Sequence, residues 1–156
     1  MTRHYPDPQD WYEDQAVGHR GLSPTRTVTA ADIGTFAGLT GDMAELHTSE
    51  THAAATEFGG RIAHGMLNLA LMHGLVVRGG RLVSSGLALL GWSEVRFTGP
   101  VRIGDTVQAE WETIALRESA SRPEAGIVTD RVSLRNQHGE VVVTGTVTEL
   151  VRKRPV

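Results

Sequence analysis

The sequence predicts an α+β fold in which an antiparallel sheet is wrapped around one long apolar helix. The helix is expected in residues 61–80, where the stretch is apolar on nearly all sides and must therefore be enclosed by other parts of the protein. The second half of the chain instead alternates apolar and polar residues, which is typical of half-buried strands. With 156 residues, we expect a single domain over 1–156 with a partly irregular segment at 1–20.

Three helices are expected in the first half of the chain. Thr29 precedes a helical repeat and is followed by an acidic first turn, so a short helix is expected to begin there and to end near Gly38 or Gly41. A second short helix is expected from Thr48 to the glycine pair at 59–60. The apolar helix that follows is expected to span about 18 residues, or roughly 27 Å.

Four strands are expected in the second half. The stretches 105–118, 128–135 and 141–148 alternate in polarity, and a longer strand is expected to end at Pro100. Asp130 interrupts the alternation of its strand, so the face that it occupies stays open. Residues 117–126 are expected to form the connection of a hairpin.

The composition argues against several functional classes. The formal net charge is -3 and the basic residues are scattered, so no nucleic-acid partner is expected. The chain has no cysteine, which excludes disulfides, thiolate zinc sites and a cysteine nucleophile. The apolar stretch falls short of the roughly 20 residues that a membrane span needs, and residues 1–15 lack the apolar core of a secretory signal. We therefore expect no membrane partner and a cytoplasmic location.

Asp42 and His47 stand five residues apart, shortly before the His64-Gly65 pair that opens the apolar helix. The sequence around them resembles the hot-dog fold of the MaoC-like dehydratases and (R)-specific enoyl-CoA hydratases. The resemblance covers most of the chain, and its two middle blocks are specific in order, spacing and composition. The matching blocks are WYEDQAVGH from residue 11, RTVTAADIGTFAGLTGD from 26, LHTSETHAAATEFGGRIAHGML from 46 and VRFTGPVRIGDTV from 95.

The resemblance implies a catalytic pair and an oxyanion donor. The family motif reads roughly Asp-x-Asn-Pro-(Leu/Ile)-His, and its first and last residues correspond to Asp42 and His47. The backbone N–H that receives the thioester oxygen corresponds to Gly65. Hydration of an enoyl thioester needs a base for the water, a proton donor for the α-carbon and a dipole for the developing oxyanion, and these groups suit those tasks.

Two positions depart from the motif, because Ala44 and Glu45 replace its Asn-Pro. Glu45 is expected either to raise the proton affinity of the catalytic pair, if it points inward, or to be solvated. Four further residues are candidates for substrate binding, although His64 is more readily explained as structural and His73 as a core histidine. The candidates are His64, Met66, Phe58 and His73.

The expected function is (R)-specific hydration of trans-2-enoyl thioesters, or the reverse dehydration of 3-hydroxyacyl thioesters. The carrier is coenzyme A or an acyl carrier protein, and the chain is expected to form a homodimer or a higher homo-oligomer. Two alternatives stay open: a non-catalytic hot-dog subunit that binds acyl thioesters, and a hot-dog acyl-thioesterase. Arg61, Arg78 and Arg81 are either contacts for carrier phosphates or plain surface charges.

Asp42, His47 and His52 lie close together in the sequence, which raises the alternative of a metal site. The spacing of the two histidines does not match the pair of a zincin helix, which also needs a glutamate beside the first histidine. We expect no metal and no cofactor.

Overall fold

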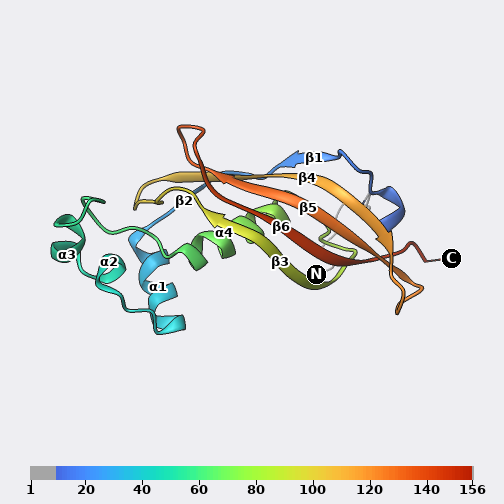
Figure 1. The fold of residues 1–156 in the computed structure, drawn as a ribbon, viewed down its shortest axis with the longest axis horizontal. Coiled ribbons are helices and arrows are strands. Elements are labelled where there is room, and N and C mark those ends of the chain that lie inside the picture. The colour runs from blue at the N-terminus through green and yellow to red at the C-terminus, as the bar shows by residue number, and fades with distance from the viewer. Residues whose placement is uncertain (1–9, 156) are drawn as a thin grey trace, which may run out of the picture.

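A long antiparallel sheet curves over one central helix, and three short helices gather at one end of the molecule (Figure 1). The structure is a computed structural model that describes residues 10–155. Part of the segment predicted to be irregular, residues 1–9, lies outside the described residues. The remainder of that segment holds a 3-10 turn at Tyr12–Asp14 and the start of the first strand.

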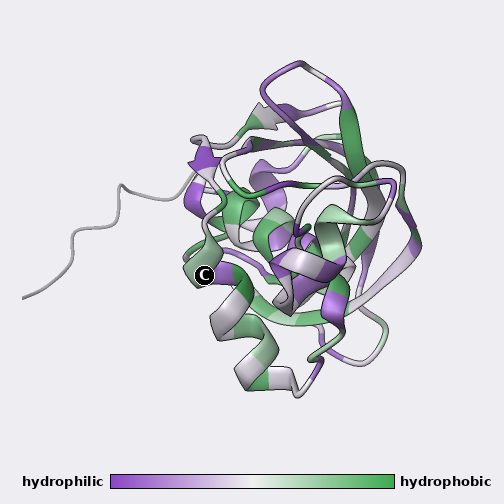
Figure 2. Ribbon diagram, turned by 90° about the vertical axis from the view of Figure 1, so that its left-hand side faces the viewer, coloured by the Kyte–Doolittle hydropathy of each residue, from purple (hydrophilic) through white to green (hydrophobic). Residues whose placement is uncertain are grey.

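The sheet has the strand order β1-β4-β5-β6-β3, and β2 pairs separately with β4. All pairings are antiparallel. Hydrophilic and hydrophobic stretches follow one another along the ribbon of the sheet (Figure 2), and buried residues alternate with less buried ones along most of β4. The four predicted strands are confirmed, whereas β1 and β2 were not predicted because three and two residues are too short to show a period. The strands are β1 (Arg20–Leu22), β2 (Arg26–Thr27), β3 (Gly86–Phe97), β4 (Thr106–Glu118), β5 (Ala125–Arg135) and β6 (Val141–Arg152).

The central helix α4 (Gly65–Arg78) packs its buried side, including Leu67, Met72 and Leu75, against the inner face of the sheet. It has 14 residues, so the prediction of about 18 was wrong at the N-terminal end. Ile62 forms a β-bridge with Arg102, and this pairing keeps the preceding residues extended. Enclosure is also incomplete within one chain, because Met66 is 59% exposed and Val77 is 40% exposed.

Helix α1 (Ala30–Thr40) is confirmed with its cap. The Thr29 side chain accepts a hydrogen bond from the Asp32 N–H, and the Asp32 carboxylate accepts one from the Thr29 N–H, so both ends of a capping box are present. Gly41 ends the helix in the left-handed conformation, with φ of 78°.

The second short helix, predicted from Thr48 to the glycine pair at 59–60, is confirmed only over residues 50–54, and an unpredicted single turn precedes it. One turn, α2 (Glu45–Thr48), is followed directly by α3 (Glu50–Ala54). Ser49 lies between them in an extended conformation and caps α3 by accepting from the His52 N–H. The break gives α2 a direction of its own, and α2 carries His47.

A buried ionic cluster lies just beyond the C-terminal end of α4. Arg81 is 4% exposed and makes two hydrogen bonds to Asp130, of 2.8 and 2.9 Å. It also donates to the Thr113 hydroxyl at 2.8 Å and to the Gln15 side-chain oxygen. Arg81 is therefore not a surface charge, and Asp130 interrupts the alternation because it faces inward to meet it. Burial, followed by the charge of Asp130, raises the pKa of the nearby Glu149 to about 7.

No helix within residues 10–155 is both long and apolar enough to cross a membrane.

Candidate active site

Asp42 follows directly after the glycine that ends α1. The Gly41 N–H donates to the Ala37 carbonyl at 2.8 Å, which closes the helix and turns the chain toward α2. The Asp42 N–H donates to the Thr40 hydroxyl at 3.3 Å, and its carboxylate accepts from the Ala44 N–H at 3.4 Å. Asp42 is exposed, so its carboxylate is accessible to solvent and to small molecules.

His47 lies on the single turn of α2 and is half-buried. Its Nδ1 lies 2.8 Å from the backbone oxygen of Ile62. A carbonyl oxygen can only accept, so Nδ1 carries the proton of the neutral ring and Nε2 keeps a free lone pair. Because Ile62 is held by its β-bridge to Arg102, the ring is anchored to the sheet scaffold. This arrangement leaves Nε2 ready to accept a proton.

Gly65 is the first residue of α4, so its N–H has no acceptor within the helix. His64 is the N-cap residue, yet no side chain caps this end of the helix. A Cβ atom at Gly65 would lie 3.3 Å from the ring of Phe97, which is tighter than ordinary contact. Glycine at this position therefore permits close packing while the helix dipole favours an anion at the free N–H groups.

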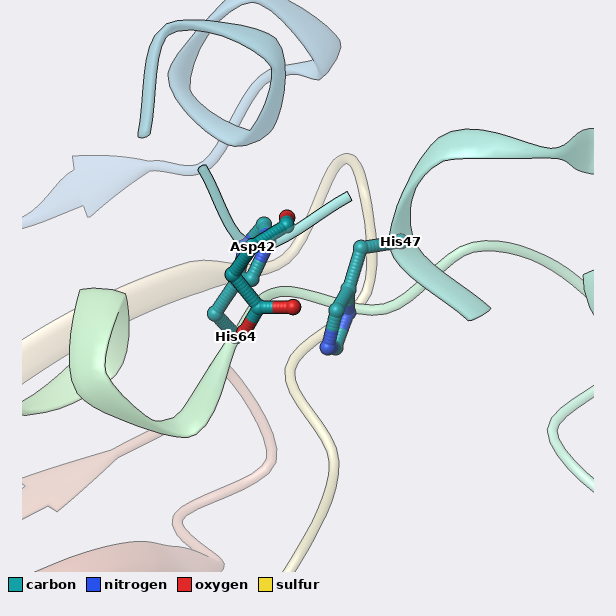
Figure 3. A group of neighbouring side chains, drawn as sticks. All are labelled: Asp42, His47 and His64. Atoms are coloured by element: carbon teal, nitrogen blue, oxygen red, sulfur yellow. The ribbon is translucent and has the colours of Figure 1, made fainter. Parts of the chain in front are cut away.

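Three side chains from separate elements converge at this end of α4 (Figure 3). One donor atom from each of Asp42, His47 and His64 lies within 4.8 Å of the others. The fold thus brings together the predicted pair and the histidine that precedes Gly65. A carboxylate, an imidazole with a free lone pair and unpaired backbone N–H groups can hold a water molecule, move its proton and stabilise an oxyanion.

The four candidate substrate-binding residues occupy different surroundings. His64 is 2% exposed, whereas Met66 is 59% exposed on α4. Phe58 is half-buried in the turn after α3, where its carbonyl accepts from Arg102 at 3.1 Å. His73 lies eight residues beyond Gly65, about 12 Å along the helix, with its ring edge-on to that of Trp92. Burial lowers the pKa of His73, and substrate contact by these residues stays a prediction.

Glu45 faces His52 and solvent rather than the predicted catalytic pair. Its carboxylate lies 3.5 Å from Nδ1 of His52 on α3, and its side chain is 70% exposed. Of the two orientations expected for Glu45, inward or solvated, the structure shows the solvated one. His52 pairs with Glu45 on the outer side. The histidine that lies close to both Asp42 and His47 is instead His64.

Two contacts at the site were not anticipated from the sequence. The ring of Phe36, on α1, lies 5.0 Å from that of His64, centroid to centroid. The carbonyl of Ile62 orients His47. Neither contact could be predicted from the sequence, because the identity of an aromatic residue or a backbone oxygen does not indicate which distant residue it contacts.

Comparison with known proteins identifies the family. The profile of the MaoC like domain matches residues 14–136. The chain belongs to the MaoC-like domain family. It is 37% identical to an (R)-specific enoyl-CoA hydratase of Rhodospirillum rubrum over 144 residues, which cover 92% of this chain and 93% of that protein. It is 40% identical to an (R)-specific enoyl-CoA hydratase of Aeromonas caviae over 126 residues, or 81% of this chain and 86% of that one.

Solved structures agree with the family assignment. The crystal structure of a MaoC-like dehydratase from Rhodospirillum rubrum superposes with a TM-score of 0.84 at 36% identity, covering 94% of this chain and 99% of that one. A Mycobacterium tuberculosis protein with a double hot-dog fold superposes with a TM-score of 0.78 on 93% of this chain and 44% of its own, and at 19% identity it bears on the fold alone. The predicted hot-dog fold of this MaoC-like protein is confirmed.

Proposed function

We propose that this MaoC-like protein catalyses the (R)-specific hydration of trans-2-enoyl thioesters and the reverse dehydration of 3-hydroxyacyl thioesters. The observation that carries the proposal is the convergence of the Asp42 carboxylate and the His47 ring beside the first residue of α4. Relatives that align over most of this chain are named (R)-specific enoyl-CoA hydratase, and others are named for dehydration of 3-hydroxybutyryl-CoA and 3-hydroxyacyl thioesters.

In the proposed mechanism, Asp42 and His47 jointly hold one water molecule. His47 accepts through Nε2, because Nδ1 already donates to Ile62. The water oxygen bonds to C3 of the enoyl group, and a proton returns to C2 through the same pair, so the elements of water are added across the double bond. Between these events the thioester oxygen carries negative charge, and the free N–H of Gly65 faces it. Each of these contributions is typically worth about 10²-fold or more in rate.

Loss of the enoyl-thioester absorbance tests the proposal. Crotonyl-CoA and a longer trans-2-enoyl-CoA are mixed with the wild-type protein and with Asp42→Asn, and the product configuration is read by chiral chromatography. We expect turnover to the (R)-3-hydroxyacyl thioester, with at least about a 10²-fold loss in the variant. If folded wild-type protein left both CoA thioesters and their carrier-protein counterparts unchanged, the catalytic proposal would be wrong and a binding subunit would replace it.

The same assay separates a thioesterase from a hydratase. A thioesterase would release a free thiol, which a thiol reagent detects, whereas hydration consumes the double bond and leaves the thioester intact. We expect no thiol release above the background of the uncatalysed reaction.

We also propose that a second copy of the chain packs against β3 and the exposed side of α4. Strand β3 is the end strand of the sheet and has 12 residues. Exposed apolar side chains lie on this strand and on the neighbouring helix α4. The two elements are in contact through the rings of His73, on α4, and Trp92, on β3. The exposed apolar side chains are Met66, Val77, Leu89, Leu90 and Phe97. A long apolar edge strand invites pairing with another chain, and a symmetric partner would satisfy it.

The mass in solution, measured by light scattering after size-exclusion chromatography, tests the assembly. Leu90→Lys places a charge on the proposed interface and is expected to shift the protein toward a single chain. Leu39→Lys is the matched control, because Leu39 is 81% exposed on α1, outside this surface. A wild-type protein that is monomeric, or a dimer that Leu90→Lys leaves unchanged, would contradict the proposed interface.

A further inference from the structure

His64 contacts both members of the proposed catalytic pair, one through a hydrogen bond and the other through ring stacking. Its Nε2 lies 3.0 Å from the backbone oxygen of Asp42. Its ring lies 3.8 Å from that of His47, centroid to centroid, with 31° between the planes. Asp42 and His47 are on separate segments, so His64 is a physical link between them (Figure 3).

The ring of His64 has almost no surface of its own. It is 2% exposed and is enclosed between His47 and the Phe36 ring, which lies at 5.0 Å. A side chain buried to this degree acts on a substrate through the residues that cover it. His64 is therefore placed to support the pair rather than to react.

The hydrogen bond to Asp42 defines the proton position on His64. The carbonyl oxygen only accepts, so Nε2 carries the proton and Nδ1 holds a lone pair. Nδ1 is buried and has no hydrogen-bond partner among the described residues. An unpaired buried polar atom destabilises the fold, and an apolar side chain of similar size would avoid that penalty. The hydrogen bond from Nε2 to Asp42 accounts for a histidine at this position.

Asp42 has few other restraints. Its remaining contacts are the bond from its N–H to Thr40 at 3.3 Å and the bond from Ala44 to its carboxylate at 3.4 Å. The bond from His64 is shorter and crosses 22 residues of sequence, so it ties the exposed Asp42 to the start of α4. Gly65 follows His64 immediately, and the same tie therefore relates Asp42 to the proposed oxyanion donor.

We propose that His64 is a positioning residue that sets the geometry of Asp42 and His47 relative to the free N–H of Gly65. The inference rests on the proposed hydratase function. A misplacement of about 1 Å between reacting groups lowers rates by about 10²-fold, so a buried link of this kind affects turnover without contacting the substrate.

Matched substitutions separate the two contacts of His64. His64→Phe keeps a ring for stacking and removes the donor to Asp42, whereas His64→Gln removes the ring and carries an amide N–H that reaches the position of Nε2. We expect kcat of His64→Phe on crotonyl-CoA to fall about 10- to 100-fold with KM changed less than about 3-fold, and His64→Gln to recover at least part of that loss. His52→Gln is the control, since this exposed histidine contacts Glu45 on the outer side, and its kcat is expected to match the wild type.

The outcomes are distinguishable. A His64→Phe enzyme with wild-type kcat, or a loss confined to KM, would overturn the positioning role while leaving the hydratase proposal intact. If the wild type has no turnover, the hydratase proposal fails first.

A measurement on the wild type does not depend on turnover or on the folding of a variant. Long-range ¹H–¹⁵N spectra of the histidine rings report which nitrogen carries the proton. We expect the two neutral rings to be opposite tautomers, with the proton on Nε2 of His64 and on Nδ1 of His47. A proton on Nδ1 of His64 would rule out the bond to Asp42 and overturn the inference.

Discussion

The two ends of α4 each hold a polar cluster, and they differ in how completely their polar groups are paired. Beyond the C-terminal end, Arg81 and Asp130 are 4% and 1% exposed and are joined by two hydrogen bonds, while Thr113 and Gln15 take further donors of the guanidinium. At the N-terminal end, Asp42 is exposed and the N–H of Gly65 has no helical acceptor.

From this difference we infer a structural cluster at the C-terminal end of α4 and the proposed reactive cluster at its N-terminal end. The buried charge of Arg81 has four hydrogen bonds to neighbouring groups, so it ties the chain after the helix to the sheet and is shielded from ligands. The groups at the opposite end keep free donors and lone pairs, which are costly for folding and are what a reaction needs. Changes at one end should therefore affect stability, and changes at the other should affect turnover.

Asp130→Asn should have the largest effect. The substitution keeps the volume but removes the charge that balances Arg81, so we expect the free energy of unfolding to fall by about 3–5 kcal/mol, measured by urea denaturation. Glu112→Gln is the control, because its pairs with Arg20 and Arg131 are solvent-exposed and should cost less than about 1 kcal/mol. Equal losses in the two variants would show that the buried cluster does not stabilise the fold. Turnover per folded Asp130→Asn molecule should stay near the wild-type value.

His47→Asn should have the opposite effect, lowering turnover while leaving stability nearly unchanged. The asparagine amide can still donate to the Ile62 carbonyl, as Nδ1 does now, but it has no basic nitrogen in the position of Nε2. We expect kcat/KM to fall at least about 10²-fold while the free energy of unfolding changes by less than about 1 kcal/mol. A variant that lost stability and kept its activity would place His47 with the structural cluster.

Glu149→Gln should make stability less dependent on pH. Burial and the charge of Asp130 raise the pKa of Glu149 from its ordinary 4.5 to about 7 in the folded protein. The folded state therefore favours the protonated group, and its contribution is complete below about pH 4.5 and is lost as the pH rises through about 7. We expect Glu149→Gln to be more stable than the wild type by about 3 kcal/mol at pH 8 and equal to it at pH 4. Thermal unfolding at a series of pH values gives the comparison, and a difference that does not grow with pH would contradict the raised pKa.

Removal of metal ions should have the smallest effect. Donor atoms of Asp42, His47 and His64 lie within 4.8 Å of one another, close enough to hold a cation. The proposed mechanism uses these groups without one, so extended dialysis against a chelator is expected to leave kcat unchanged. Loss of activity that added Zn²⁺ restores would make the N-terminal end of α4 a metal centre.

The sequence by itself predicted the fold class, which the structure confirms, and a catalytic pair, which stays a prediction. The change from helical to alternating periodicity predicted the sheet and its central helix, since these periods follow from local backbone geometry. Asp42 and His47 were predicted because the family motif is short and local, and Gly65 was predicted from the His-Gly pair at the start of the apolar helix. The capping box of α1 was likewise readable within four residues.

Only the tertiary structure decided which polar groups are partners. Arg81 and Asp130 are 49 residues apart, and His64 and Asp42 are 22 apart. The outward position of Glu45 was decided by its contact with His52 on α3. Periodicity reports which face of an element is buried, but a buried polar atom is satisfied by whichever distant group the completed fold places within hydrogen-bond distance. For that reason the residues of the site were visible in the chain, whereas the contacts that hold them were not.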